Sequence, residues 1–163
     1  MDTVNNLKTS LAGESQANRK YASFAKKADE EGYPSVAKLF RAASEAEAIH
    51  AASQLRALGA IKSTAENLKA AIEGETYEFT QMYPGFIAKA EEEGAKQAKI
   101  AFHGANEAEK VHAGLYTKAL ESLDNKPEVE YYLCTVCGNV VENEPPDKCP
   151  ICNAPNKAFK NVG

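Results

Sequence analysis

Two short segments of the chain pair a carboxylate with an imidazole at a spacing that suits a metal ion. Glu47 stands three residues before His50, and Glu109 stands three residues before His112. Side chains three residues apart on an α-helix lie one above the other, so each pair can bind one metal ion. A single Glu-x-x-His pair is more often a solvated surface pair than a ligand pair. Here the pattern occurs twice in one chain, and this repetition favours metal chemistry.

Each pair follows a helix that has its own candidate carboxylate. Glu14 and Glu75 are separated by almost the same length of chain as the two pairs, and Glu14 falls within an apolar stripe of helical periodicity. A charged glutamate among core residues is costly unless a cation meets it, and a metal ion is the simplest such cation. One Glu from each of two helices plus Glu-x-x-His from each of two others is the ligand plan of ferritin-like di-iron or di-manganese bundles. The sequence therefore predicts two helical hairpins that together bind two metal ions.

The second hairpin has a further carboxylate. Glu78 follows Glu75 by three residues, whereas Ala17 occupies the matching position of the first hairpin. One metal ion is therefore expected to have an extra carboxylate, and we interpret Glu78 as the ligand that changes its coordination with oxidation state. The candidate ligands of the dinuclear site are Glu14, Glu47, His50, Glu75, Glu78, Glu109 and His112.

Two tyrosines follow the first carboxylate of each hairpin. Tyr21 is seven residues past Glu14, and Tyr83 is eight residues past Glu75. Their hydroxyl groups either orient ligands and donate protons at the metal site, or belong to aromatic side chains that fill the core. Spacing alone does not decide between these two roles.

Helical periodicity and capping residues define the helices that would position these side chains. Helices are predicted over Thr3–Glu30 and Pro34–Leu58, because a proline suits a first helical turn and a glycine lies beyond the end of each helix. A capping-box sequence at Ser63 starts a third helix, which Pro84 is expected to kink or interrupt. A fourth helix is predicted from residue 95 to about residue 124.

The connection between the two hairpins is short. A ferritin-like bundle needs a long crossover between its hairpins, and residues 60–63 supply one only if their neighbours are extended. The alternative is an exchange of hairpins between two chains. Both arrangements are compatible with the sequence.

The C-terminal segment from residue 131 differs in composition from the helical part. It holds all four cysteines and four of the seven prolines, and it contains few strong helix formers. We therefore predict a mainly α protein with two domains, a four-helix bundle over residues 1–126 and a small domain over residues 131–163. A short polar linker joins them.

The cysteines form two Cys-x-x-Cys motifs, which are typical of a tetrahedral four-thiolate metal site. Disulfides are the weaker alternative, because so short a segment holds too little core to fold without a metal. Zinc and iron both accept four thiolates, and a redox-active iron is favoured beside a dinuclear carboxylate site. The four ligands would be Cys134, Cys137, Cys149 and Cys152.

Composition argues against several other classes of protein. A net charge of −4 and a pI near 5.5 argue against binding to nucleic acid. The chain has no run approaching the ~20 apolar residues of a membrane span. Its first residues lack the basic start and apolar core of a secretory signal. A cytoplasmic protein without membrane or nucleic-acid partners is expected.

These motifs occur as a set in one known family. The segments concerned are Ala12–Ala17 with Tyr21, Glu47–His50, Gly74–Glu78, Met82–Pro84, Glu109–His112, Cys134–Gly138 and Cys149–Cys152. In these segments the chain resembles the rubrerythrins over essentially its whole length. The resemblance implies a ferritin-like four-helix bundle with a non-haem di-iron site, and a rubredoxin-like domain with one iron bound by four cysteines. It also implies that the seven candidates above bind the di-iron site and that Tyr21 and Tyr83 place hydroxyls beside it.

The function that the resemblance implies is reduction of hydrogen peroxide to water by a homodimer. Glu78, Tyr21 and Tyr83 would be the catalytic side chains. Electrons would come from a donor such as a rubredoxin or an NAD(P)H-dependent reductase and pass through the tetrathiolate iron. The alternatives are a ferroxidase or O2-reducing protein of the same fold, an iron-storage protein, and a zinc-ribbon adaptor.

The length of the last helix bears on how electrons would reach the di-iron site. From His112 to Asp124 the helix extends about 18 Å at ~1.5 Å per residue. Unless the linker folds back, the four-cysteine domain would therefore lie far from its own di-iron site. A homodimer packed head to tail is predicted to bring the two iron sites together.

Overall fold

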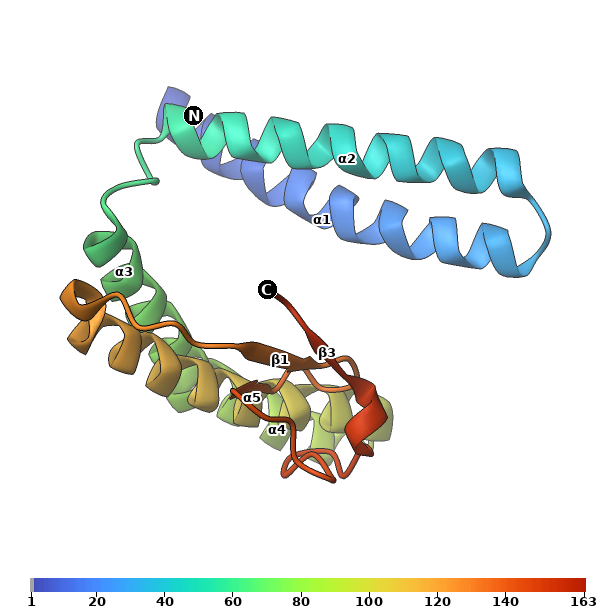
Figure 1. The fold of residues 1–163 in the computed structure, drawn as a ribbon. Helices are drawn as coiled ribbons and strands as arrows, with labels where there is room; N and C mark the ends of the chain where they lie inside the picture. Colours follow the sequence, from blue (N-terminus) through green and yellow to red (C-terminus); the bar gives the residue numbers. More distant parts are fainter. Residues whose placement is uncertain (1) are drawn as a thin grey trace. The chain divides into compact units, whose positions relative to one another are not determined.

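The structure is a computed structural model that describes residues 2–163. The chain divides into two compact units, one that ends at Lys62 and one over Ser63–Gly163. Figure 1 shows the first unit in blue to cyan and the second from green to red. No helix within the described part of the chain is long and apolar enough to cross a membrane. The domain division at residues 126–131 lies inside the second unit and stays a prediction.

The first unit is a hairpin of two long helices, α1 (Thr3–Glu30) and α2 (Pro34–Ala57), which lie side by side (Figure 1). Asp2 caps α1, because its side chain accepts a hydrogen bond of 2.8 Å from the backbone N–H of Asn5. Gly32 has a φ of 80° in the turn between the helices, a conformation that glycine adopts at little cost. Both helices agree with the predicted bounds to within one residue.

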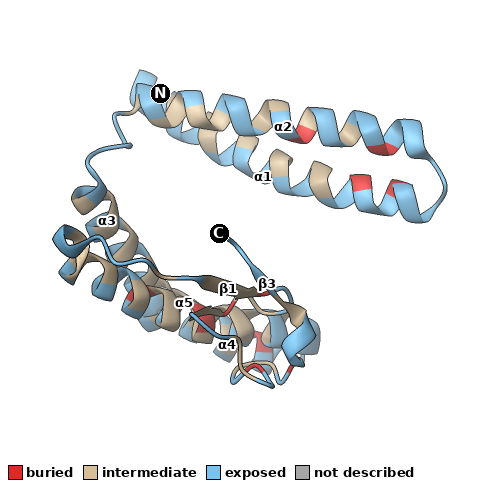
Figure 2. Cartoon of the chain, viewed as in Figure 1, coloured by how far each residue is buried: buried red, intermediate tan, exposed pale blue. Residues whose placement is uncertain are grey.

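Small side chains let these two helices pack closely. Figure 2 shows only a few buried positions on the hairpin, and the apolar ones are Ala25, Ala28 and Ala37. The side-chain amide of Asn18 donates a hydrogen bond of 2.7 Å to the backbone carbonyl of Ser44 on the facing helix. Larger apolar side chains stay partly open, and Phe24 is 46% exposed. The hairpin therefore presents apolar surface beyond its own contact.

The second unit begins with the predicted capping box, in which Ser63 and Glu66 each satisfy a backbone N–H of the other. Its helical elements are α3 (Thr64–Tyr77), the π-helical turn η1 (Glu78–Met82), α4 (Tyr83–Glu92) and α5 (Lys96–Glu121). Pro84 lies in the first turn of α4, where its missing N–H is tolerated. The predicted interruption of this helix is confirmed, and it takes the form of a π turn that precedes the proline.

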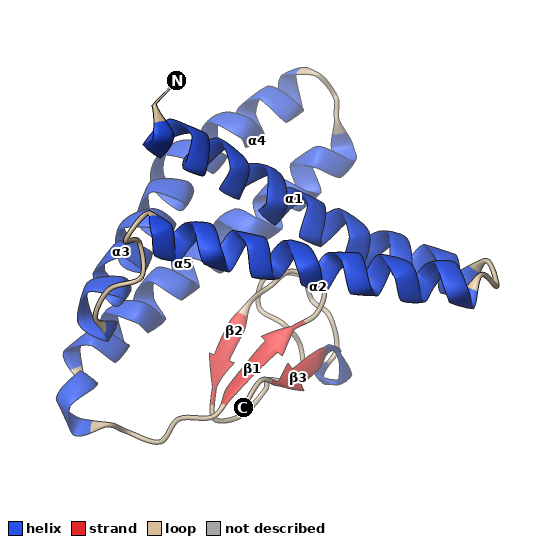
Figure 3. Ribbon diagram, turned by 90° about the horizontal axis from the view of Figure 1, so that it is seen from above, coloured by secondary structure: helices blue, strands red, loops and turns tan. Residues whose placement is uncertain are grey.

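The C-terminal part of the second unit is a small antiparallel sheet, drawn in red in Figure 3. Its elements are β1 (Tyr131–Cys134), β2 (Val140–Glu142), the 3₁₀ turn η3 (Asn156–Ala158) and β3 (Phe159–Asn161), and the strand order is β2-β1-β3. Cys134 and Cys149 are fully buried and form its core with Ala154. So small a core agrees with the expectation that this segment needs a metal to fold.

The linker turns this sheet back towards α5. A 3₁₀ turn, η2 (Leu123–Asn125), follows α5, and Lys126 then adopts a left-handed conformation with a φ of 45°. Because the chain reverses there, β2 lies against α5 and does not extend beyond its end. The linker therefore folds back, and the four-cysteine segment stays near the helices of its own unit. Because the linker is not extended, it gives no reason for a head-to-tail homodimer, and the homodimer itself stays a prediction.

Candidate metal centres

Three of the predicted ligands meet in the first hairpin. Glu14 comes from α1, and Glu47 and His50 come from one face of α2; their ligand atoms all lie within 4.8 Å of one another. Nδ1 of His50 is 3.0 Å from Oε2 of Glu47. Hydrogen bonding with Glu47, then burial, raises the pKa of Glu14, whereas hydrogen bonding with His50 lowers the pKa of Glu47. Such a cluster of oxygen and nitrogen donors fits a divalent cation.

The second hairpin repeats this group with Glu75 from α3 and with Glu109 and His112 from α5. Nδ1 of His112 lies 2.7 Å from Oε2 of Glu109 and 4.0 Å from Oε1 of Glu75. Burial, followed by the negative charge of Glu109, raises the pKa of Glu75 to about 7. Two carboxyl groups this close resist ionising together unless a cation joins them. The donor set therefore fits a metal ion in the second hairpin as well.

Glu78 is the predicted ligand that does not belong to either three-residue group. Burial, then the negative charge of Glu109, raises the pKa of Glu78, so its carboxyl group lies close to the second group. The role of Glu78 as a metal ligand stays a prediction.

The two tyrosines belong to matching aromatic clusters. The members are Tyr21, Phe24 and Phe40 in the first hairpin, and Tyr83, Phe86 and Phe102 in the second. The ring centroids are 6.3, 6.1 and 5.5 Å apart in the first cluster and 6.2, 6.2 and 5.5 Å apart in the second. Burial, then the charges of nearby carboxylates with Glu78 first, raises the pKa of Tyr83. Tyr83 therefore fills the core and also lies near the carboxylates.

The second hairpin has one more residue than the first between its carboxylate and its tyrosine. Seven residues separate Glu75 from Tyr83, whereas six separate Glu14 from Tyr21. Each residue of an α-helix adds a rotation of about 100°, so an uninterrupted helix would turn Tyr83 away from the face that holds Glu75. The matching aromatic clusters show that this rotation does not occur.

The π turn η1 absorbs the additional residue. The backbone N–H of Tyr83 donates to the carbonyl of Glu78, five residues earlier, where an α-helix would use the residue four earlier. Inside this widened turn the hydroxyl of Thr80 donates a hydrogen bond of 2.5 Å to the carbonyl of Thr76. The turn therefore keeps Tyr83 in register with its cluster while Glu75 stays in register with Glu109.

Deletion of Thr80 is expected to convert η1 into an ordinary α-helical turn. Both ends of the helix keep their register, so the free energy of unfolding should change by no more than about 1 kcal/mol. Deletion of Gln16 from α1 is the matched control. Helix α1 has no π turn to remove, so this deletion rotates Tyr21 out of its cluster. It should lower the free energy of unfolding by about 3 kcal/mol. Chemical denaturation of both variants tests this, and equal losses would contradict it.

The four cysteines converge as predicted. All four Sγ atoms lie within 4.8 Å of one another, with 3.7 Å between Cys134 and Cys152 and 3.6 Å between Cys137 and Cys149. A disulfide requires about 2.05 Å, whereas four thiolates placed ~2.3 Å from one ion in a tetrahedron are about 3.8 Å apart. The sulfur positions therefore fit one tetrahedral metal ion.

The two Cys-x-x-Cys motifs form equivalent loops, each followed by a residue with positive φ. Gly138 has a φ of 84° and Asn153 a φ of 59°. Their N–H groups donate to the carbonyls of Cys134 and Cys149, at 3.0 and 2.9 Å. Burial opposes ionisation of the Cys149 thiol, but backbone N–H groups directed at it outweigh this and lower its pKa to about 7. The second loop therefore favours a thiolate at Cys149.

A hydrogen bond joins the second metal group to the four-cysteine site. Nε2 of His112 lies 2.9 Å from the carbonyl oxygen of Gly138, the residue after Cys137. A carbonyl only accepts, so Nε2 carries the hydrogen, and in the neutral ring Nδ1 keeps a lone pair for a metal. This contact also shields the ring, because the side chain of His112 is 20% exposed and that of His50 is 55% exposed.

Sequence reasoning missed Gly138 as part of the site. Its contribution is a backbone carbonyl, which no side-chain pattern reveals, and the chain reversal at Lys126 has no glycine to signal it. Asn139 was missed as well: it is 1% exposed, and its side-chain amide lies 3.8 Å from Sγ of Cys149. A polar residue directly after a Cys-x-x-Cys-Gly motif is the signal that would have pointed to it.

Comparisons with known proteins agree with this geometry. The rubrerythrin family model matches residues 5–120, and the model of the rubrerythrin rubredoxin-like domain matches residues 132–160. Nigerythrin of Nitratidesulfovibrio vulgaris is 38% identical over 171 residues, which cover 96% of this chain and 85% of that protein. Rubrerythrin-2 of Clostridium acetobutylicum is 33% identical, with 97% of this chain and 95% of that protein covered.

A solved structure of nigerythrin in its fully reduced, all-ferrous state also matches. It is 37% identical, has a TM-score of 0.61, and the match covers 99% of this chain and 87% of that chain. The predicted fold class, mainly helical with a small C-terminal four-cysteine domain, is confirmed. The chain belongs to the rubrerythrin family, with carboxylate and histidine groups for a di-iron site and a rubredoxin-like four-cysteine iron site.

Proposed function

We propose that this protein is a peroxidase that reduces hydrogen peroxide by the reaction H2O2 + 2 e⁻ + 2 H⁺ → 2 H2O. Membership of the rubrerythrin family supports an oxidoreductase with a di-iron site and a rubredoxin-like site. The observation that carries the proposal further is the hydrogen bond between His112 and Gly138, because it links a ligand group of one site to the cysteine loop of the other.

Bound iron would supply the two-electron reduction at the carboxylate site and one-electron relay at the four-cysteine site. The protein's own contribution starts with His112. Its Nε2–H is fixed by the Gly138 carbonyl, which holds the ring with Nδ1 towards Glu109 and Glu75. A ring fixed in this way needs no reorientation when the redox state of either site changes.

The remaining side chains of the site handle charge and protons. Glu78 stands beside Glu109 but outside the three-residue group, so it is placed to join or leave as the charge of the site changes. Burial and neighbouring carboxylates raise the pKa of Tyr83, so its hydroxyl keeps its proton at neutral pH. We assign to Tyr83, and to Tyr21 in the first hairpin, the role of holding a proton for the product water.

The complete di-iron site would combine one hairpin from each of two chains. In a ferritin-like bundle the crossover between the hairpins runs along the bundle. The 24 residues of α2 extend about 36 Å, whereas the six residues between α2 and α3 reach at most about 21 Å. The connection is therefore too short for that crossover. A homodimer with exchanged hairpins joins Glu14, Glu47 and His50 of one copy to the second group of another copy.

The four-cysteine site fits an electron donor outside the chain. A rubredoxin or an NAD(P)H-dependent reductase is the class of donor that we propose, because a tetrathiolate iron accepts one electron at a time. The four cysteines form no disulfide, which agrees with our proposal that the protein works in the cytoplasm.

A competition between two oxidants tests the proposed reaction. Anaerobically reduced, iron-loaded protein is mixed in a stopped-flow instrument with H2O2 or with O2 at equal concentrations. The proposal predicts faster oxidation by H2O2 and repeated turnover when reductant is present. Faster oxidation by O2, or ferric iron that accumulates without turnover, would instead indicate a ferroxidase, an O2-reducing protein or an iron store. Two redox-inert metals without turnover would indicate an adaptor.

A further inference from the structure

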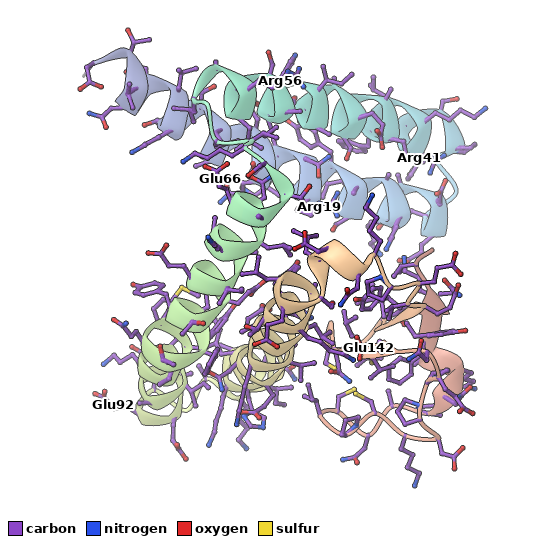
Figure 4. The ribbon with its side chains drawn as sticks, turned by 60° about the vertical axis from the view of Figure 1, so that its left-hand side comes forward. Arg19, Arg41, Arg56, Glu66, Glu92 and Glu142 are labelled. Carbon is purple, nitrogen blue, oxygen red and sulfur yellow. The ribbon has the colours of Figure 1, made fainter. Side chains whose placement is uncertain are left out.

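The four-cysteine domain meets α5 at separate points within the second unit. One point is the hydrogen bond between His112 and the first cysteine loop. A second is the approach of Cys137 to Gly104, where an added Cβ would lie 3.7 Å from Cβ of Cys137. A third is an ion pair between Lys118 of α5 and Glu142 of β2. Figure 4 labels Glu142.

Two pockets open along this interface. A cavity of about 340 Å³ is lined by Leu115 of α5 and Val140 of β2, among others. A second cavity of about 460 Å³ is lined by both members of the ion pair, Lys118 and Glu142. Where these pockets open, the two surfaces do not touch and gain no dispersion contacts. The polar contacts beside the pockets therefore help to hold the domain in place.

The ion pair is placed where it restricts rotation of the domain. Lys118 lies six residues beyond His112 on the same helix, so the domain is held at two points along α5. The side chain of Glu142 is 19% exposed, and a cationic partner stabilises a carboxylate that is partly removed from water. Lys118 provides that partner while its own side chain stays 62% exposed.

We infer that Lys118 is a positioning residue: its ion pair with Glu142 latches the four-cysteine domain onto α5 and keeps the Gly138 carbonyl on His112. This inference rests on the proposed function, because the latch serves to maintain the contact between His112 and Gly138 that links the two metal sites. Lys118 touches neither site, so it acts only through the position of the domain.

The latch is tested by the exchange of one proton. In the zinc-loaded, diamagnetic protein, NMR measures how fast the Nε2–H of His112 exchanges with water. Loss of the ion pair in Lys118→Met should speed this exchange about fivefold, and Glu142→Gln should do the same. Added salt should speed exchange in the unchanged protein but not in Lys118→Met, because the ion pair is screened.

Two further variants separate the latch from a general effect of charge. Lys96→Met removes another exposed lysine of α5, at its first residue, and should leave the exchange rate unchanged. The double variant Lys118→Glu with Glu142→Lys restores the pair with reversed charges and should bring the rate back to within about twofold of the original. The visible band of the iron-loaded four-cysteine site should be the same in every variant.

An unchanged exchange rate in Lys118→Met would overturn the inference, and so would a double variant that exchanges as fast as the single ones. Loss of the four-cysteine band in Lys118→Met would also overturn it, because Lys118 would then stabilise the domain itself. The readout needs no peroxide. Faster exchange of the His112 proton in Lys118→Met, in a protein that does not reduce peroxide, would support the latch and refute the proposed function. Unchanged exchange in a protein that reduces peroxide would refute the latch and leave the proposed function standing.

Discussion

Mixing two inactive variants of this protein is expected to restore a complete di-metal site. One variant carries Glu14→Ala with Glu47→Ala, and the other carries Glu75→Ala with Glu109→Ala. Each lacks one half of every site and should reduce no peroxide. When hairpins are exchanged, a mixed dimer contains one site built only from unchanged hairpins. Random mixing then returns roughly one quarter of the original activity and of the iron bound at the di-metal sites, while the four-cysteine iron stays in every chain.

The measurement is iron content and peroxide turnover after the two chains are unfolded together and refolded, with each variant refolded alone as the control. The result depends on whether the two hairpins of one site belong to the same chain or to different chains, and not on the strength of any one ligand. If each chain completes its own site, every site in the mixture lacks two ligands, and no activity returns. That outcome would refute the exchange of hairpins and leave the ligand assignment untouched.

Replacing Cys149 by Ser should abolish peroxide turnover with an external reductant. Cys149 is fully buried at the centre of the small domain, so its loss removes a metal ligand and the staple on which the fold depends. The carboxylate groups lie on other elements, so a pre-reduced di-iron site should still be oxidised once by H2O2. Single-turnover and steady-state kinetics of the same sample separate the two effects.

Asn153→Gly is the matched control for this variant. It lies in the same loop and has a φ of 59°, which glycine adopts easily, so the four-cysteine site and turnover should be retained. Full turnover of Cys149→Ser with an external donor would contradict the role of the four-cysteine site as a relay.

Much of the site was predictable because helical periodicity converts sequence spacing directly into geometry. Glu47 and His50 had to share a face, and so did Glu109 and His112, whatever the rest of the fold. The Cys-x-x-Cys spacing likewise determined which sulfur atoms converge. Caps and prolines gave the helix bounds, since their backbone requirements are local.

Other features depend on compensation between distant residues, which local patterns do not contain. The π turn follows from the need to keep Tyr83 in its aromatic cluster and Glu75 beside Glu109, although the spacing between them has one residue too many. The position of the four-cysteine domain depends on the left-handed backbone of Lys126 and on a carbonyl contact at His112. Neither has a sequence signature.

Transfer of electrons from the four-cysteine iron to peroxide is followed by the colour of that iron during a single turnover. Fully reduced protein with about three irons per chain is mixed anaerobically with about two equivalents of H2O2 per chain, which accept about four electrons and so exceed the roughly three that the irons hold. The visible band of the oxidised tetrathiolate iron is recorded with time. We expect that the peroxide is consumed and that the band then returns, as electrons leave the four-cysteine site past Gly138 and His112. Consumption of peroxide without any return of the band, or zinc in the four-cysteine site of the native protein, would contradict it.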